Sequence, residues 1–254
     1  MAEEILYENR GRVAVITINR PAARNAINQG VREGLTEAWE RFAKERETRA
    51  AILTGAGDKA FCAGADLKEM ALKKLGSLPR NFLPTLNVNT QVTKPVIAAV
   101  NGVAYAGGWA LVQMCDIVVA SQTASFAITE AKVGRGMPWA VPLTHMIPQK
   151  VLLEILLTGN PVTAQRAYEI GFVNHVVPAE QVMPKALEIA ETIAENAPLT
   201  VAAAKEMVYL ATDMGRLAGL EAARHLFDHV YRSEDAQEGP RAFAEKRKPQ
   251  WKGR

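Results

Sequence analysis

Two loops decide how this sequence is interpreted: Phe61-Cys62-Ala63-Gly64-Ala65-Asp66 and Asn101-Gly102-Val103-Ala104-Tyr105-Ala106-Gly107-Gly108. Each loop follows a short apolar run typical of a buried strand, at 51–54 and at 96–100, and each precedes residues that can begin a helix. Small residues let the main chain approach a ligand closely, and a helix N-terminus leaves N–H groups unpaired. Two such loops can direct backbone N–H groups at one oxygen atom. This pattern predicts an oxyanion hole, and hence the chemistry of a carbonyl group.

Strand and helix signals alternate on both sides of these loops. Apolar runs at 13–18, 115–120 and 124–128 predict further strands. After the first of these runs, Asn28 is a suitable N-cap for a helix. That helix carries apolar residues at helical spacing, namely Val31, Leu35, Ala38, Trp39 and Phe42. Because parallel strands need crossover connections, often helical, we expect an α/β fold with a largely parallel sheet.

The last part of the sequence predicts helices only. No strand signal follows residue 180, and Ala197-Pro198 ends one helix and begins the next. A later helix repeats apolar residues, at Leu217, Leu220, Ala223, Phe227 and Val230, and Ser233 caps the final one. Such an apolar face needs a surface to pack on, either the sheet layer or a neighbouring subunit. We therefore expect an α/β core at 1–196 and a helical region at 197–254.

The composition is that of an ordinary globular protein. The chain has 254 residues, of which 48% are apolar and 22% are charged, and its formal charge of +3 is too small to imply binding to nucleic acid. The N-terminal residues 1–5 are acidic and lack the basic and apolar blocks of a secretion signal. No apolar run reaches the length of a membrane span. The sequence favours a cytoplasmic protein that binds no membrane.

Neither the cysteines nor the histidines form a metal-binding pattern. Cys62 and Cys115 make no C-x-x-C pair, and the four histidines are scattered along the chain. His225 and His229 have the i,i+4 spacing of a helical ligand pair, but no nearby Glu or Cys completes a site. We expect no metal.

Several segments together identify a family. The stretches 61–70 and 94–102 resemble those of the crotonase superfamily, the enoyl-CoA hydratases and isomerases. Three more segments agree with that family, at 24–26, at 157–167 and at 242–247. The resemblance extends over essentially the whole chain and keeps the family's order, so it is far more specific than a single glycine motif.

The resemblance implies a fold, an assembly and a class of substrate. It implies a spiral of ββα units with a helical C-terminal trimerisation region, and hence a homotrimer or a hexamer. It also implies that the substrate is a coenzyme A thioester, so that coenzyme A enters as part of the substrate and no cofactor is bound permanently.

The resemblance also assigns site residues. The N–H groups of Ala63 and Gly107 are expected to hold the thioester oxygen, and Glu130 is expected to act as the acid and base. The residues expected to contact coenzyme A or the acyl group are Arg24, Ala26, Ala63, Gly64, Ala65, Asp66, Leu67, Gly107, Gly108, Trp109 and Trp139. Removing a proton beside a thioester, or adding water to its double bond, puts negative charge on the carbonyl oxygen, which two N–H donors stabilise.

One departure from the family pattern bears on the reaction. Counting from Asn101-Gly102, the position of the second hydratase glutamate holds Ala110. Hydratases of the family use two glutamates to hold water, whereas Glu130 alone can take a proton at one carbon and return it at another. Double-bond isomerisation is therefore slightly favoured over hydration or dehydration. Thioester hydrolysis, C–C cleavage and acyl-CoA or partner binding without catalysis remain alternatives.

A second departure lies at 134–142, where many hydratases have a glycine-rich stretch and this chain has Trp139 and two prolines. The large apolar residues near both departures either line a pocket for a bulky acyl group or belong to the core. They are Tyr105, Trp109, Met137 and Trp139. Arg135 pairs either with a substrate carboxylate or with Glu130. The basic tail at 245–254 is either a solvated helix end or attracts the phosphates of the coenzyme.

Overall fold

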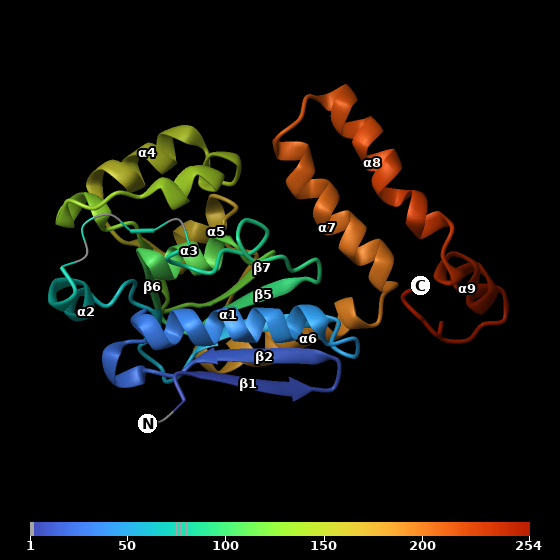
Figure 1. Ribbon diagram of the computed structural model, residues 1–254, viewed down its shortest axis with the longest axis horizontal. Coiled ribbons are helices and arrows are strands. Elements are labelled where there is room, and N and C mark those ends of the chain that lie inside the picture. The colour runs from blue at the N-terminus through green and yellow to red at the C-terminus, as the bar shows by residue number, and fades with distance from the viewer. Residues whose placement is uncertain (1–2, 75, 77, 80) are drawn as a thin grey trace.

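The computed structural model describes residues 3–74, 76, 78, 79 and 81–254. The sequence also predicts a helix at 66–75 and an exposed loop at 76–81, and residues 75, 77 and 80 of these segments lie outside the described residues. In Figure 1 the sheets and the helices that cover them form one body, and the last helices extend away from it.

Among the described residues, the larger sheet has six strands in the order β1-β2-β3-β5-β7-β10. They are β1 (Ile5–Arg10), β2 (Val13–Ile18), β3 (Ala50–Gly55), β5 (Val96–Val100), β7 (Ile117–Ser121) and β10 (His175–Val177). β1 and β2 are antiparallel, and every other neighbouring pair is parallel. β3 and β5 are buried at every residue, as expected for parallel strands covered on both faces.

Helices cover both faces of this sheet. α1 (Gln29–Lys44) begins at Asn28, whose side chain accepts a hydrogen bond from the Val31 N–H. The five apolar residues predicted on its inner face are all buried in the core cluster of that face. α6 (Val182–Ala194) covers the opposite face, where Ala186 and Ala190 pack with Ile52 and Ile97 (Figure 1).

A smaller sheet continues from the ends of the larger one. Its strands are β4 (Ala60–Cys62), β6 (Val103–Tyr105), β8 (Ser125–Ala127) and β9 (Val162–Thr163), in that order. β4, β6 and β8 are parallel, and they follow β3, β5 and β7 respectively after a few residues. A helix follows each of them, so the chain repeats a β-β-helix unit three times within its described part. The predicted α/β class is confirmed.

The remaining helices of this body are short. They are α2 (Leu67–Leu72), α3 (Gly107–Gln113), α4 (Gln149–Thr158) and α5 (Ala164–Glu169), with the 3₁₀-helices η1 (Pro21–Ala23), η2 (Glu130–Val133), η3 (Pro138–His145) and η4 (Ala179–Gln181). No helix in the described ranges combines the length and the apolar character needed to cross a bilayer.

The C-terminal helices are α7 (Pro198–Thr212), α8 (Arg216–Tyr231) and α9 (Glu234–Ala244). α7 and α8 run side by side, and α9 follows the end of α8 that lies by the start of α7 (Figure 1). After α9 the chain returns to the start of α7, where the Trp251 indole N–H donates to the Glu195 carbonyl at 2.7 Å. α7 is tied to the sheet through Asp116, whose carboxylate pairs with Lys205 at 2.9 Å and accepts the Tyr209 hydroxyl at 2.8 Å. The Val96 N–H donates to the same carboxylate at 2.7 Å.

Candidate active site

The carboxyl edge of the smaller sheet brings three segments together. β4 and β6 pair at Cys62 and Ala104, and β6 and β8 pair at Tyr105 and Ala127. Because these strands are parallel, the residues that follow them emerge at the same edge. The two glycine loops touch one another at this edge, and the segment that carries Glu130 follows the neighbouring strand, β8.

Glycine is required where the two loops touch. A Cβ atom on Gly64 would lie 2.9 Å from the Tyr105 carbonyl oxygen and 3.4 Å from the Gly107 nitrogen, and Gly64 has φ of 94°. A Cβ on Gly108 would collide with the Cys62 carbonyl oxygen. Such contacts and this φ exclude a larger residue, so these glycines permit the close approach of the two main chains.

The amide of Ala63 is not available to a ligand. The Ala63 N–H donates to the Arg24 carbonyl at 3.0 Å, across a turn in which Arg24 has φ of 51°. This corrects the prediction that Ala63 supplies an oxyanion donor. The sequence could not show this contact, because it depends on a carbonyl almost forty residues earlier.

Two other amides at this edge are available. Within the described part of the chain, no acceptor bonds the N–H of Ala65 or that of Gly107. Gly107 is the first residue of α3, where helical N–H groups have no partner within the helix. A Cβ on Gly107 would lie 3.7 Å from the Ala65 nitrogen, so the two amides are close neighbours.

Buried polar contacts hold the first loop in place. Asn25 donates to the carbonyls of Ala56 and Ala60 at 3.0 and 2.7 Å. The Asp66 carboxylate caps α2 by accepting the N–H groups of Lys68 and Glu69, and it pairs with Arg20 at 3.2 Å. The side chain of Asp66 therefore makes its hydrogen bonds and its ion pair within the protein.

Glu130 is a buried carboxyl group with one free oxygen. It begins η2 three residues after β8 and is only 7% exposed. Its Oε1 accepts the Trp139 indole N–H at 3.0 Å, whereas its Oε2 is buried with no hydrogen-bond partner in the described structure. Burial raises the pKa of Glu130 above its ordinary value, although the hydrogen bond from Trp139 opposes this. A carboxyl group of this kind is suited to proton transfer.

Helix α3 begins at Gly107, and its last residue, Gln113, contacts the segment that carries Trp139. Ala110 lies in α3 with its side chain buried, so no second carboxylate is present at this position. One turn further on, Gln113 donates its Nε2–H to the Trp139 carbonyl. The sequence analysis missed Gln113, because a glutamine within an apolar helical run carries no signal of its own.

Trp109 and Trp139 differ in burial and in the residues they contact. Trp109 has 0% exposure and packs against Phe126 and Phe172, with ring centroids 5.6 and 5.1 Å apart. It therefore belongs to the core, which corrects its assignment to the substrate site. Trp139 is only partly buried and touches Glu130 directly.

The other predicted contact residues surround the first loop. The Leu67 side chain is 60% exposed at the start of α2, and the Arg24 side chain is also exposed. Ala26 is partly buried, and its carbonyl accepts a hydrogen bond from Arg20. The basic tail is largely neutralised, because Arg247 pairs with Glu238 and other tail residues pair with α9.

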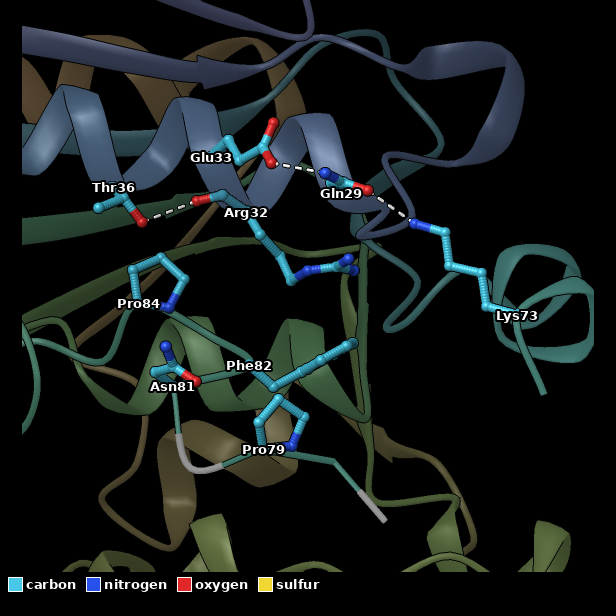
Figure 2. A pocket seen from close by; sticks show the side chains of 9 residues that line it. All are labelled: Gln29, Arg32, Glu33, Thr36, Lys73, Pro79, Asn81, Phe82 and Pro84. Atoms are coloured by element: carbon cyan, nitrogen blue, oxygen red, sulfur yellow. Dashed lines mark hydrogen bonds between the residues drawn. The ribbon is translucent and has the colours of Figure 1, made fainter. Parts of the chain in front are cut away.

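A pocket of about 370 Å³ lies apart from these residues. It is enclosed by α1 and the segment around Phe82, and the Arg32 guanidinium lies 4.4 Å from the Phe82 ring centroid (Figure 2). Arg32 and Lys73 both pair with Glu69, at 3.1 and 2.7 Å. Its described lining includes neither the two loops nor Glu130, so we do not place the reaction there.

The comparison with family models decides the classification. Residues 8–254 match the model described as enoyl-CoA hydratase/isomerase. The chain belongs to this family. The chain is 40% identical to the enoyl-CoA hydratase EchA19 of Mycobacterium tuberculosis, an alignment that covers 99% of the chain and 97% of that protein. It is 38% identical to the carnitinyl-CoA dehydratase of Proteus mirabilis, with 100% of both chains covered.

Comparison with solved structures supports the same classification. The structure is similar to that of the enoyl-CoA hydratase EchA1 from Mycobacterium marinum, with a TM-score of 0.92, 36% identity and coverage of 99% and 100% of the two chains. It is also similar to an enoyl-CoA hydratase from Bacillus anthracis, with a TM-score of 0.89, 34% identity and coverage of 99% and 100%. The crotonase-like fold is thus confirmed.

Proposed function

We propose that this protein forms and reprotonates the enolate of an acyl-CoA thioester. The Ala65 and Gly107 amides bind the thioester oxygen, and Glu130 takes and returns the proton. The observation that carries this proposal is the buried carboxyl group with one unpartnered oxygen, together with two neighbouring amides that have no acceptor in the described chain. Each oxyanion donor typically contributes about 10²–10³ in rate.

Within this chemistry, a shift of the double bond is the best-supported reaction, because it needs only one carboxylate. Glu130 removes a proton from the γ carbon of a 2-enoyl thioester, and the electron pair moves to the thioester oxygen as a dienolate. Return of the same proton to the α carbon gives the 3-enoyl thioester, so atoms and charge balance. One carboxylate completes this cycle, and Ala110 supplies no second one.

Hydration or dehydration is the second candidate, because relatives that cover the whole chain are named hydratase and carnitinyl-CoA dehydratase. In that reaction Glu130 acts on water at the β carbon and the same two amides hold the enolate. The free oxygen of Glu130 suits this role as well.

The coenzyme is proposed to lie along the first loop. Leu67 is a large apolar residue left 60% exposed at the start of α2, next to the exposed Arg24. An exposed leucine suits the face of the adenine ring, and a guanidinium suits a phosphate. The coenzyme is part of the substrate, and the protein provides no further cofactor in this proposal.

Exposed apolar residues on the C-terminal helices support an oligomer. They include Met207 and Val208 on α7 and Leu217 and Leu220 on α8, and the exposed Met214 lies in the turn between the two helices. Apolar side chains gathered on a protruding helix pair indicate a surface that another subunit covers. We propose a homotrimer, or a hexamer of two trimers, built through α7 and α8.

An acyl-CoA panel separates these reactions. The purified protein is incubated with 2-enoyl and 3-enoyl thioesters, and the products are followed by mass and by absorbance of the conjugated double bond. Unchanged mass with altered conjugation supports isomerisation, and a gain of one water supports hydration. Free coenzyme A, or no turnover of any thioester, would contradict the proposal.

A further inference from the structure

The site contains a second buried acceptor besides Glu130. The Gln113 side chain is 6% exposed, and its Oε1 has no hydrogen-bond partner in the part of the chain that the structure describes. Leaving a buried acceptor unpaired costs stability, so a group that donates to it is expected when the site is filled.

The orientation of the Gln113 amide follows from its neighbour. The second terminal atom of the amide lies within hydrogen-bonding distance of the Trp139 carbonyl oxygen, and a carbonyl oxygen can only accept a hydrogen bond. The NH₂ group must therefore face Trp139, and the atom without a partner must be the oxygen, Oε1. Since that oxygen can only accept, its missing partner is a donor.

Gln113 and Glu130 are joined through one residue. Trp139 accepts from Gln113 with its carbonyl and donates to Glu130 with its indole N–H. Gln113 also lies three residues after Ala110 in α3, and residues at this spacing share a helix face. Gln113 and Glu130 thus contact the same residue, Trp139, and Gln113 shares a helix face with Ala110, which provides no carboxylate.

We propose that Gln113 is a specificity-determining residue of this site, whose Oε1 accepts a hydrogen bond from an O–H group held beside Glu130. The O–H belongs either to a hydroxyl on the acyl chain or to a bound water. This inference rests on the proposed function. It predicts that the site selects a hydroxylated acyl group or retains a water despite the loss of the second glutamate.

The test uses Gln113→Leu, which keeps the volume and removes the acceptor. Butanoyl-CoA and its 3-hydroxy and 4-hydroxy derivatives are each followed in D₂O by deuterium uptake at the α carbon. If the hydroxyl is on the acyl chain, the wild type favours one hydroxylated thioester, and the variant loses that preference by about tenfold. Loss of folding or of Glu130 alignment lowers all rates together and leaves their ratios unchanged.

A second arm identifies water as the source. But-2-enoyl-CoA is incubated in H₂¹⁸O, and ¹⁸O uptake is divided by the rate of α-deuterium uptake into butanoyl-CoA. If Gln113 holds water, this quotient falls about tenfold in the variant. The exposed Gln165→Leu serves as the matched control and is expected to leave both readouts at wild-type values.

The outcomes separate this inference from the proposed function. If α-deuterium uptake persists and neither the substrate ratios nor the ¹⁸O quotient differ between wild type and Gln113→Leu, the role of Gln113 is overturned and the enolate chemistry stands. If the wild type shows no deuterium or ¹⁸O uptake with any of these thioesters, both proposals are overturned.

Discussion

At the scale of single residues, Glu130 combines proton transfer with a cost in stability. Burial raises its pKa, so the folded state disfavours the charged form. Stability from this group is present below its unfolded pKa and is lost as the pH rises through the folded pKa. Glu130→Gln should therefore raise the free energy of unfolding near pH 8 by about 1 kcal/mol and lower kcat by about 10²–10⁴. Urea unfolding at pH 4 and pH 8 tests the first part, because the gain should shrink at low pH.

Trp139 should set the pH at which Glu130 works as a base. Its indole N–H lowers the pKa of Glu130, so Trp139→Phe removes that effect and raises the pKa further. Because a base must be deprotonated, the rising limb of the kcat/KM profile should move to higher pH in this variant. A limb that stays in place, or moves to lower pH, would show that the hydrogen bond does not tune the catalytic carboxyl group.

Ala106 stores backbone strain between β6 and α3. It has φ of 51° and ψ of −117°, a conformation that only glycine adopts easily, and its N–H is held by the Ala127 carbonyl at 2.8 Å. Ala106→Gly should therefore stabilise the protein by about 1 kcal/mol. Ala190→Gly in α6 is the matched control and should destabilise it by at least a similar amount. Loss of stability in Ala106→Gly, measured by urea unfolding, would argue against the strain.

At the scale of elements, α7 is held to the sheet by a buried ion pair. The Lys205 side chain is only 6% exposed and pairs with Asp116, which also accepts hydrogen bonds from Tyr209 and Val96. Lys205→Met leaves the carboxylate without its cation and should destabilise the fold by about 3 kcal/mol. Lys252→Met breaks a pair with Glu234 on the surface and should change stability by under about 0.5 kcal/mol. Equal urea midpoints for the two variants would contradict this assignment.

The elements also show what the sequence could predict. The buried strands β2, β3 and β5 and the face of α1 follow from apolar periodicity, and the structure confirms them. The sequence did not predict β1 or β10, which are edge strands. β1 has one buried residue and β10 has none, so neither shows the apolar pattern of a buried strand. The sequence also predicts Glu130 as the acid and base. The structure shows that this carboxyl group is buried with one unpartnered oxygen, and its role stays a prediction. The hydrogen bond that occupies the Ala63 amide and the one that holds Gln113 against Trp139 are long-range contacts, which no local pattern encodes.

At the scale of the whole molecule, the protruding helices predict assembly. Leu217 is 82% exposed and lies on the same helix as Leu220. Leu217→Glu should lower the molar mass measured by light scattering from that of a trimer or hexamer to that of one chain, because a charge cannot be buried unpaired at an interface. Arg224→Glu, at an exposed position of the same helix, is the control and should leave the mass unchanged. A wild-type protein that is already monomeric would contradict the assembly.

The central claim is that Glu130 forms an acyl-CoA enolate whose oxygen the Ala65 and Gly107 amides hold. Its most direct test is deuterium uptake at the α carbon of butanoyl-CoA in D₂O, because this exchange requires the enolate and no later step. We predict uptake by the wild type and a loss of about 10²–10⁴ in its rate for Glu130→Gln, with coenzyme A binding retained. Exchange at the wild-type rate in Glu130→Gln would contradict the account.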